Sequence, residues 1–126
     1  MLYGIFKALD YTHSLGVFHR DLKPQNIMVD PDTKNPKLVD WGHADQYFFG
    51  KEYSVKIASG HYKAPELLVG HGTYDYSVDV WALGALFASM LFKEKTFFSR
   101  GQIGGTYEIN DQLEIVTEIM GTEGLL

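Results

Sequence analysis

The sequence predicts a mainly α-helical α+β fold that contains one short β-hairpin. Two segments have helical character, because residues 2–15 carry apolar side chains at helical spacing and residues 78–92 are nearly all apolar. Two short strand-like runs, at residues 27–29 and 37–39, are separated by a stretch of turn-forming residues. With 126 residues, 45% hydrophobic and 21% charged, the chain matches one globular domain or part of one.

Charge and composition argue against several classes of partner and location. The net charge of -5 does not favour a nucleic acid or an anionic membrane as partner, since both require a basic surface. The apolar run at 78–92 contains a carboxylate and falls short of the roughly 20 apolar residues of a membrane span. The chain has no cysteine, which excludes disulfides and thiolate metal sites. Residues 1–15 do not have the pattern of a signal peptide.

The first expected element is a helix over residues 2–15. Its apolar residues follow the i, i+3, i+4, i+7 pattern of one helix face, at Leu2, Ile5, Phe6 and Leu9. Gly16 is placed to end this helix. Residues 19–26 are expected to form a loop, because Pro24 disfavours helical structure at the residue before it.

The loop and the hairpin carry side chains that suit phosphate and magnesium. Asp21 can accept a proton from a hydroxyl group, and Lys23 can neutralise a phosphoryl group during transfer. Asn26 and Asp40 offer hard oxygen ligands of the kind that Mg²⁺ prefers. A hairpin over residues 27–39 would bring Asp40 back beside Asn26.

The rest of the chain is expected to be helical, apart from two loops. Residues 43–64 show little periodicity and predict a long functional loop. A short helix is expected at residues 64–68, with Pro65 in its first turn, and a buried central helix at 78–92. A glycine-rich loop at 99–105 precedes a final amphipathic helix.

The final helix is expected to begin at its cap Asn110 and to end at Gly121. There is no internal repeat and no interdomain linker, so a single domain is expected over residues 1–126.

Four motifs occur in the order in which the eukaryotic protein-kinase catalytic domain carries them. They are His19–Asn26, Asp40–Gly42, Ala64–Glu66 and Asp79–Gly84. Further segments resemble the casein kinase II catalytic alpha subunit, namely Trp41 where most kinases have Phe, Leu9–Ser14, Lys63–Val69, Tyr74–Ser77 and Gly121–Glu123. The resemblance covers essentially the whole chain and implies a partial larger, C-terminal lobe of the protein-kinase fold.

The resemblance implies a Ser/Thr protein kinase that transfers the γ-phosphate of ATP to acidic proteins. Asp21 matches the catalytic base, and Lys23 matches the residue that contacts the transferring phosphate. Asn26 and Asp40 match the Mg²⁺ ligands. His19 and Arg20 are expected to hold the loop, and a regulatory beta subunit and a nuclear and cytoplasmic location are implied by the family alone.

The same resemblance assigns further residues to binding and anchoring. Met28 and Val39 match the lower wall of the adenine pocket, a role compatible with packing in the core. Lys56 and Lys63 match basic positions that contact acidic residues of the substrate, and ordinary solvated lysines are an equal alternative. Asp79 is expected to accept hydrogen bonds from the loop backbone, since a carboxylate in an apolar helix needs donors.

The departures from the family pattern point to a second hypothesis. The glycine-rich phosphate loop, strand lysine and partner glutamate of a kinase precede the first helix, and these 126 residues do not include them. Gly60 replaces an arginine of the resembled kinase, and Glu66 has no downstream arginine to pair with. The 126 residues alone are therefore expected to be inactive. The alternative function is a non-catalytic kinase remnant that acts as a protein-interaction module.

Overall fold

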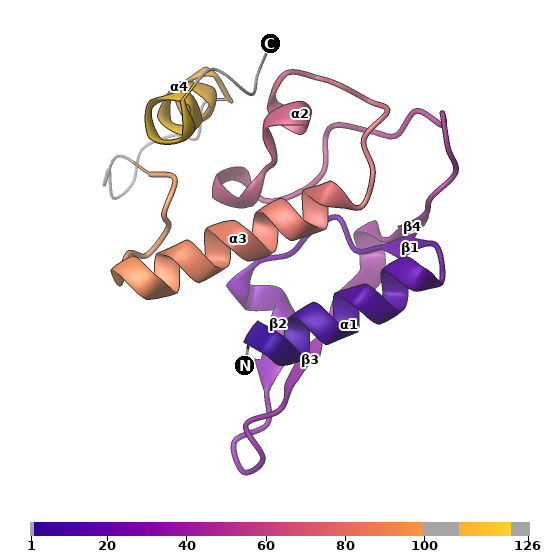
Figure 1. Ribbon diagram of the computed structural model, residues 1–126, viewed down its shortest axis with the longest axis vertical. Coiled ribbons are helices and arrows are strands. Elements are labelled where there is room, and N and C mark those ends of the chain that lie inside the picture. The colour runs from indigo at the N-terminus through magenta and orange to yellow at the C-terminus, as the bar shows by residue number, and fades with distance from the viewer. Residues whose placement is uncertain (1, 100–108, 122–126) are drawn as a thin grey trace.

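The computed structural model describes residues 2–99 and 109–121 and contains four α-helices within those ranges. They are α1 (Leu2–Ser14), α2 (Pro65–Leu68), α3 (Ser77–Phe92) and α4 (Ile109–Met120). In Figure 1, α3 runs through the middle of the molecule, with α1 on one side of it and α2 and α4 on the other. Short 3₁₀ turns lie at Pro24–Asn26, Trp41–His43 and Gly60–Tyr62. The mainly helical α+β prediction is confirmed.

Four short strands form two antiparallel pairs among the described residues. They are β1 (Val17–Phe18), β2 (Ile27–Val29), β3 (Pro36–Leu38) and β4 (Asp45–Gln46). β2 pairs with β3, so that Ile27 lies opposite Leu38, which confirms the predicted hairpin with its second strand one residue earlier. β1 pairs with β4, with Phe18 opposite Asp45. The second pair lies partly inside the segment 43–64, which was expected to be a long functional loop.

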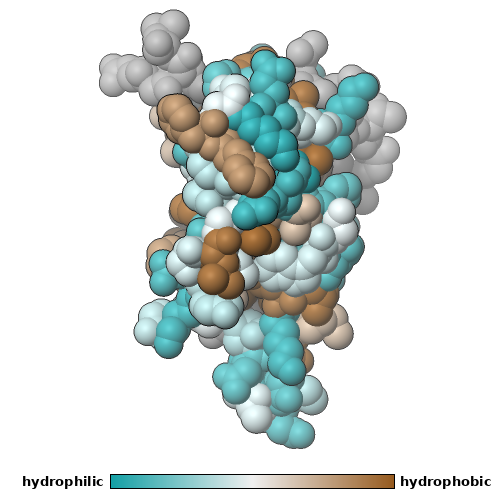
Figure 2. Space-filling view, turned by 90° about the vertical axis from the view of Figure 1, so that its right-hand side faces the viewer, coloured by the Kyte–Doolittle hydropathy of each residue, from teal (hydrophilic) through white to brown (hydrophobic). Residues whose placement is uncertain are grey.

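The tip of the β2–β3 hairpin is polar and extends away from the helices. Asp30, Asp32 and Lys34 are exposed there, and Figure 2 shows a hydrophilic end at the bottom of the molecule, where Figure 1 places the hairpin. The Asp30 carboxylate accepts hydrogen bonds from the backbone N–H groups of Asp32 and Thr33, at 2.9 and 2.7 Å. These bonds form the turn that the Asp-Pro-Asp sequence predicts.

The core lies on one face of α3, so the prediction of a buried central helix is correct for that face only. Leu83 and Leu86 are buried in a cluster with residues of α1 and α4. On the other face Val80, Phe87 and Leu91 are 50%, 49% and 62% exposed. When apolar residues occur on every side of a helix, the sequence does not show which side packs against the rest of the protein. Composition alone could therefore not predict that one face of α3 is buried and the other exposed.

The helix ends differ slightly from those predicted. α1 ends at Ser14, and Gly16 follows with a φ of +78°, a left-handed conformation in which its N–H donates to the His13 carbonyl at 2.9 Å. Asn110 lies inside α4, which begins at Ile109, so it is not the cap of that helix. The predicted loop at 99–105 lies, except for Ser99, outside the described residues. No described helix has the length and apolar character that crossing a membrane requires.

Candidate active site

Asp21 lies at the centre of a hydrogen-bond network in the loop between β1 and β2. Its side chain is buried, with the residue 4% exposed. Its Oδ2 accepts hydrogen bonds from Lys23 Nζ at 2.7 Å and from Asn26 Nδ2 at 3.1 Å. Its Oδ1 accepts one from Ser59 Oγ at 2.8 Å, and Lys23 Nζ also donates to Ser59 Oγ at 3.0 Å. Asp21, Lys23 and Asn26 are therefore in direct contact. They are three of the four polar residues that the sequence predicted for the site.

The network keeps Asp21 in its charged form. Burial by itself raises the pKa of Asp21, but hydrogen bonds from Lys23, Ser59 and Asn26 and the charge of Lys23 lower it. The lowering effects prevail, so the pKa of Asp21 lies below its ordinary value. At neutral pH the group is a carboxylate that can accept hydrogen bonds from hydroxyl groups.

Asp79 in the first turn of α3 holds the start of the loop by its backbone. Its Oδ2 accepts a hydrogen bond from the His19 N–H, and its Oδ1 accepts one from the Arg20 N–H, both at 2.7 Å. The carboxylate is 1% exposed, so these bonds are formed out of water. The expectation that Asp79 accepts hydrogen bonds from the loop backbone is confirmed.

The His19 side chain connects the loop to the end of the hairpin. The Asp21 N–H donates to His19 Nδ1 at 3.3 Å, which leaves the ring proton on Nε2. Nε2 then donates to the Val39 carbonyl at 3.1 Å. His19 therefore holds Asp21 at a fixed place relative to the strand that precedes Asp40, as predicted.

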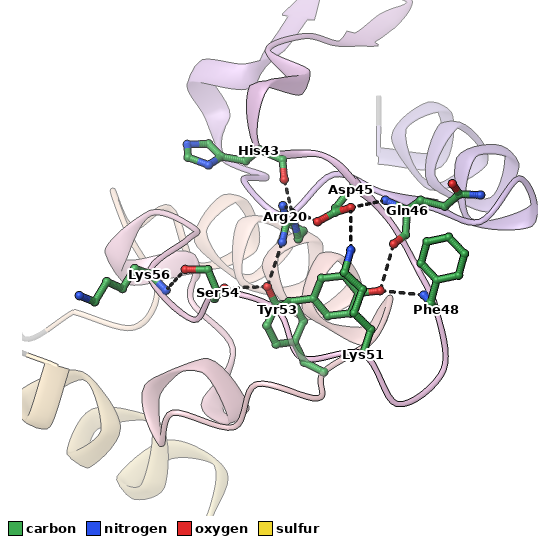
Figure 3. A network of polar contacts seen from close by, with 10 residues as sticks. Arg20, His43, Asp45, Gln46, Phe48, Lys51, Tyr53, Ser54 and Lys56 are labelled. Carbon is green, nitrogen blue, oxygen red and sulfur yellow. Dashed lines mark hydrogen bonds and ion pairs between the residues drawn. The ribbon is translucent and has the colours of Figure 1, made fainter.

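The Arg20 side chain connects the loop to the segment that follows the hairpin. Figure 3 shows Arg20 between the His43 carbonyl and the Asp45 carboxylate. Arg20 Nε donates to the His43 carbonyl at 2.6 Å, and its guanidinium lies 3.4 Å from Asp45 Oδ2. The guanidinium also lies over the rings of Phe18 and Tyr53, with its central carbon 5.3 and 5.8 Å from their centroids. The expected anchoring role of Arg20 is confirmed, and its charge is balanced within the chain.

Asn26 and Asp40 occupy neighbouring backbone positions with different exposure. The Val39 N–H donates to the Asn26 carbonyl at 3.0 Å, so the hairpin returns Asp40 to Asn26 as predicted. Asn26 is buried, and its amide N–H group points to Asp21, whereas Asp40 is exposed. A Cβ added to Gly42 would lie 3.3 Å from Asp40 Oδ1, so the glycine leaves room for the Asp40 carboxylate. One amide oxygen and one exposed carboxylate suit Mg²⁺ by their chemistry, and ligation by these two residues stays a prediction.

The two residues predicted for the adenine pocket lie toward the outside of the hairpin. Met28 is 59% exposed and is therefore not a core residue, whereas Val39 is half-buried. Both have the apolar character that a planar aromatic ligand requires. Their contact with a nucleotide stays a prediction.

The two predicted substrate-binding lysines differ in their environment. Lys56 is exposed, whereas Lys63 is buried and donates from Nζ to the Val55 carbonyl at 3.2 Å. Burial lowers the pKa of the Lys63 ammonium group. Lys63 can contact an acidic substrate only if it leaves this carbonyl, while Lys56 needs no such change. The role of both lysines stays a prediction.

Sequence reasoning missed three residues of the site. Ser59 contacts both Asp21 and Lys23, His13 contacts Asp79 at 2.9 Å, and Asp45 pairs with Arg20. Each lies far from its partner along the chain and belongs to a residue type that is common on surfaces. The position of Ser59 shortly before the Ala64–Glu66 motif was the only available signal.

The family model described as protein kinase domain matches residues 1–124. The match includes the Asp21 network, the Asp79 anchor and the hairpin that ends at Asp40. The chain therefore belongs to the protein kinase domain family, whose chemistry is phosphoryl transfer.

Proposed function

We propose that the chain is the substrate-side part of a Ser/Thr protein kinase with a preference for acidic proteins, similar to casein kinase II. The observation that carries the proposal is the contact of one buried carboxylate with Lys23, Asn26 and Ser59. A carboxylate held in this way suits the orientation of an acceptor hydroxyl group. ATP and Mg²⁺ are the expected cofactors of the family.

The residues of this chain would divide the work as follows. As the acceptor oxygen forms its bond to the γ-phosphorus and the bond from phosphorus to ADP breaks, Asp21 takes the hydroxyl proton. In the structure, Lys23 Nζ donates a hydrogen bond to Asp21 Oδ2. During transfer, Lys23 would donate to the phosphoryl group instead and stabilise its negative charge. Asn26 and Asp40 would hold Mg²⁺, which supplies neutralisation of phosphate charge when it is bound.

Ser59 supports the assignment to Ser/Thr substrates. Its hydroxyl donates to Asp21 Oδ1 and accepts from Lys23, so a small aliphatic hydroxyl group already reaches both groups from one place. We infer that the acceptor approaches the same carboxylate beside Ser59. An acceptor Ser or Thr is of similar size to Ser59, whereas a Tyr hydroxyl lies at the end of a long rigid ring.

The acidic preference rests mainly on Lys56. Its exposed ammonium group lies on the same chain segment as Ser59 and can attract a substrate carboxylate without breaking a contact. The replacement of Lys56 by Met should therefore reduce the preference for acidic peptides more than the replacement of Lys63. Lys63→Met is the matched control, because it removes the same charge from a buried position.

The 126 residues alone are proposed to be inactive or nearly so. Positioning of the reacting groups supplies about 7 to 11 kcal/mol of barrier lowering, and most of it requires a held nucleotide. The kinase elements that hold ATP phosphates are not among these residues.

The test compares the native protein from its source with the isolated 126 residues. The Asp21→Asn variant of each chain is produced as the control. Phosphate transfer from Mg·ATP is measured on an acidic Ser peptide, on its Tyr counterpart and on a peptide with Lys in place of the acids. We expect transfer by a native protein larger than 14.3 kDa, strongest on the acidic Ser peptide and abolished by Asp21→Asn. Equal transfer to the Tyr peptide would refute the Ser/Thr assignment. Transfer by the 126 residues, lost in Asp21→Asn, would refute their inactivity.

A protein-interaction module is the second candidate, and a groove favours it. The groove, with a volume of about 940 Å³, lies among α2, α3 and α4, and its lining includes Trp81, Phe97 and Leu113. The Trp81 indole N–H is buried and has no acceptor among the residues that the structure describes. A native mass of 14.3 kDa together with no transfer to any peptide would favour this candidate over the enzyme.

A further inference from the structure

We propose that His13 is a positioning residue of the Asp21 loop and acts through Asp79. The inference rests on the proposed function, because it assigns His13 to the machinery that holds the catalytic carboxylate. His13 lies in the last turn of α1 and does not contact Asp21 or Lys23 by any hydrogen bond in the described residues. Its Nε2 lies 2.9 Å from Asp79 Oδ2.

The conformation of the loop depends on Asp79. Arg20 has a φ of +68°, a left-handed conformation that residues other than glycine rarely adopt. The peptide groups around this conformation must be held from outside. Asp79 holds the side before it by accepting the His19 and Arg20 N–H groups, and the Asp21 N–H on the other side donates to His19 Nδ1. Asp21 is the next residue, so the Asp79 carboxylate holds the chain directly before it, while His19 Nδ1 accepts the Asp21 N–H.

The side chain of His13 in α1 supports the orientation of that carboxylate. Asp79 Oδ2 receives both the His19 N–H and His13 Nε2, while Oδ1 receives only the Arg20 N–H. The bond from His13 is the only side-chain hydrogen bond to Asp79 among the described residues. Without it, each carboxylate oxygen keeps a single backbone donor, and no side chain holds the carboxylate against the motion of the loop itself.

His13 is itself held in place. Its ring lies 4.8 Å from the ring of Tyr76, the residue before α3, and its side chain is 15% exposed. Since Asp79 can only accept hydrogen bonds as a carboxylate, His13 must carry its proton on Nε2. His13 thus joins α1, α3 and the loop at one point.

The test is residue-by-residue amide hydrogen exchange on the full chain, with His13→Leu and His13→Gln. Leu keeps most of the side-chain volume and removes the donor, whereas Gln keeps an N–H donor of similar reach. In His13→Leu we expect the His19 and Arg20 amides to exchange about tenfold faster relative to the α1 amides of Ile5 and Leu9, as loss of one hydrogen bond to a charged group predicts. His13→Gln should restore the ratio to within about twofold.

The matched control is His71→Leu, which changes an exposed histidine whose ring contacts Thr73. It should leave the ratio of loop to helix exchange unchanged. If His13→Leu accelerates all amides equally, or if His13→Gln behaves like His13→Leu, His13 has only a structural role and the proposal is wrong.

A second measurement applies even if His13→Leu does not fold. The ring nitrogen shifts of His13 in the unaltered chain must show a proton on Nε2, and a bare Nε2 overturns the proposal. Neither readout requires phosphate transfer, so the proposed function and the role of His13 can fail independently.

Discussion

The two carboxylates at the centre of the predicted site lie in opposite environments. Asp21 is buried and accepts hydrogen bonds from Lys23, Asn26 and Ser59. Asp40, at the end of the hairpin, is exposed and has a left-handed backbone with a φ of +61°. Both oxygens of the Asp21 carboxylate thus have hydrogen-bond donors from this chain. The side of the site that carries Asp40 and Met28 is open to solvent and hence to a ligand.

The largest effect is expected where the Asp21 side is anchored. Asp79→Ala should lower the free energy of unfolding by about 3 to 5 kcal/mol, because it leaves buried donors without their acceptor. The measurement is urea unfolding followed by circular dichroism. Asp10→Ala, at an exposed position of α1, is the control and should change stability by no more than about 0.5 kcal/mol. Equal losses in both variants would contradict the anchoring role of Asp79.

A pH effect of intermediate size should also belong to the Asp21 side. Because the folded pKa of Asp21 lies below its ordinary value, its stabilising contribution is present above about pH 4 and is lost as the pH falls through the folded pKa. The pKa of Asp45 is also lowered: burial raises it, but hydrogen bonds from Gln46 and Lys51 and the charges of Arg20 and Lys51 outweigh that effect.

Urea unfolding over a series of pH values measures this loss. The Asp21→Asn variant should show a smaller decrease on acidification than the unaltered chain, and Asp10→Asn should show the same decrease as the unaltered chain. A steeper decrease in Asp21→Asn would reverse the sign of the linkage and contradict the pKa direction.

A smaller effect is expected at Ser59. Ser59→Ala removes the donor to Asp21 Oδ1 and should reduce the free energy of unfolding by about 1 kcal/mol. In an active native protein it should also reduce kcat on Ser peptides. Ser59→Thr retains the hydroxyl group and serves as the control for both measurements. If Ala and Thr behave alike, the hydroxyl group does not position Asp21.

The smallest effect is expected on the open side. Met28→Ser should change the free energy of unfolding by no more than about 0.5 kcal/mol, because the side chain is 59% exposed. Ile5→Val, at a 1% exposed position in the core, should destabilise by about 0.5 to 1.5 kcal/mol in the same urea experiment. A larger loss for Met28→Ser than for Ile5→Val would show that the hairpin is packed against something in solution.

Local patterns in the sequence predicted the regular elements well. The spacing of Leu2, Ile5 and Leu9 predicted α1, and the turn chemistry around Asp30 predicted the β2–β3 hairpin. The strands β1 and β4 escaped prediction because each has two residues, which is too few to show a period of two. Their pairing depends on a contact between distant segments, which propensity does not encode.

The site was predictable in its motif residues and unpredictable in its supports. The motif positions of Asp21, Lys23 and Asn26 identified groups that the structure places in contact. Ser59 lies 38 residues from Asp21, and His13 lies 66 residues from Asp79, so only the folded chain shows those contacts. The burial of Lys63 depends on packing by its neighbours and leaves no signal in the local sequence.

The pairing of β1 with β4 has a consequence for the order of folding. Val17 pairs with Gln46, and Phe18 pairs with Asp45. The Asp21 loop and the β2–β3 hairpin therefore lie in the chain segment between these strands, whose two ends are joined by two residue pairs. Closure of a segment of this length costs about 3 kcal/mol in chain entropy, which so short a ladder does not recover alone. The Arg20–Asp45 pair adds a contact across the base of this segment, and Asp79 in α3 holds its first residues. The segment that carries Asp21 should therefore become ordered late, after α1 and α3 have packed.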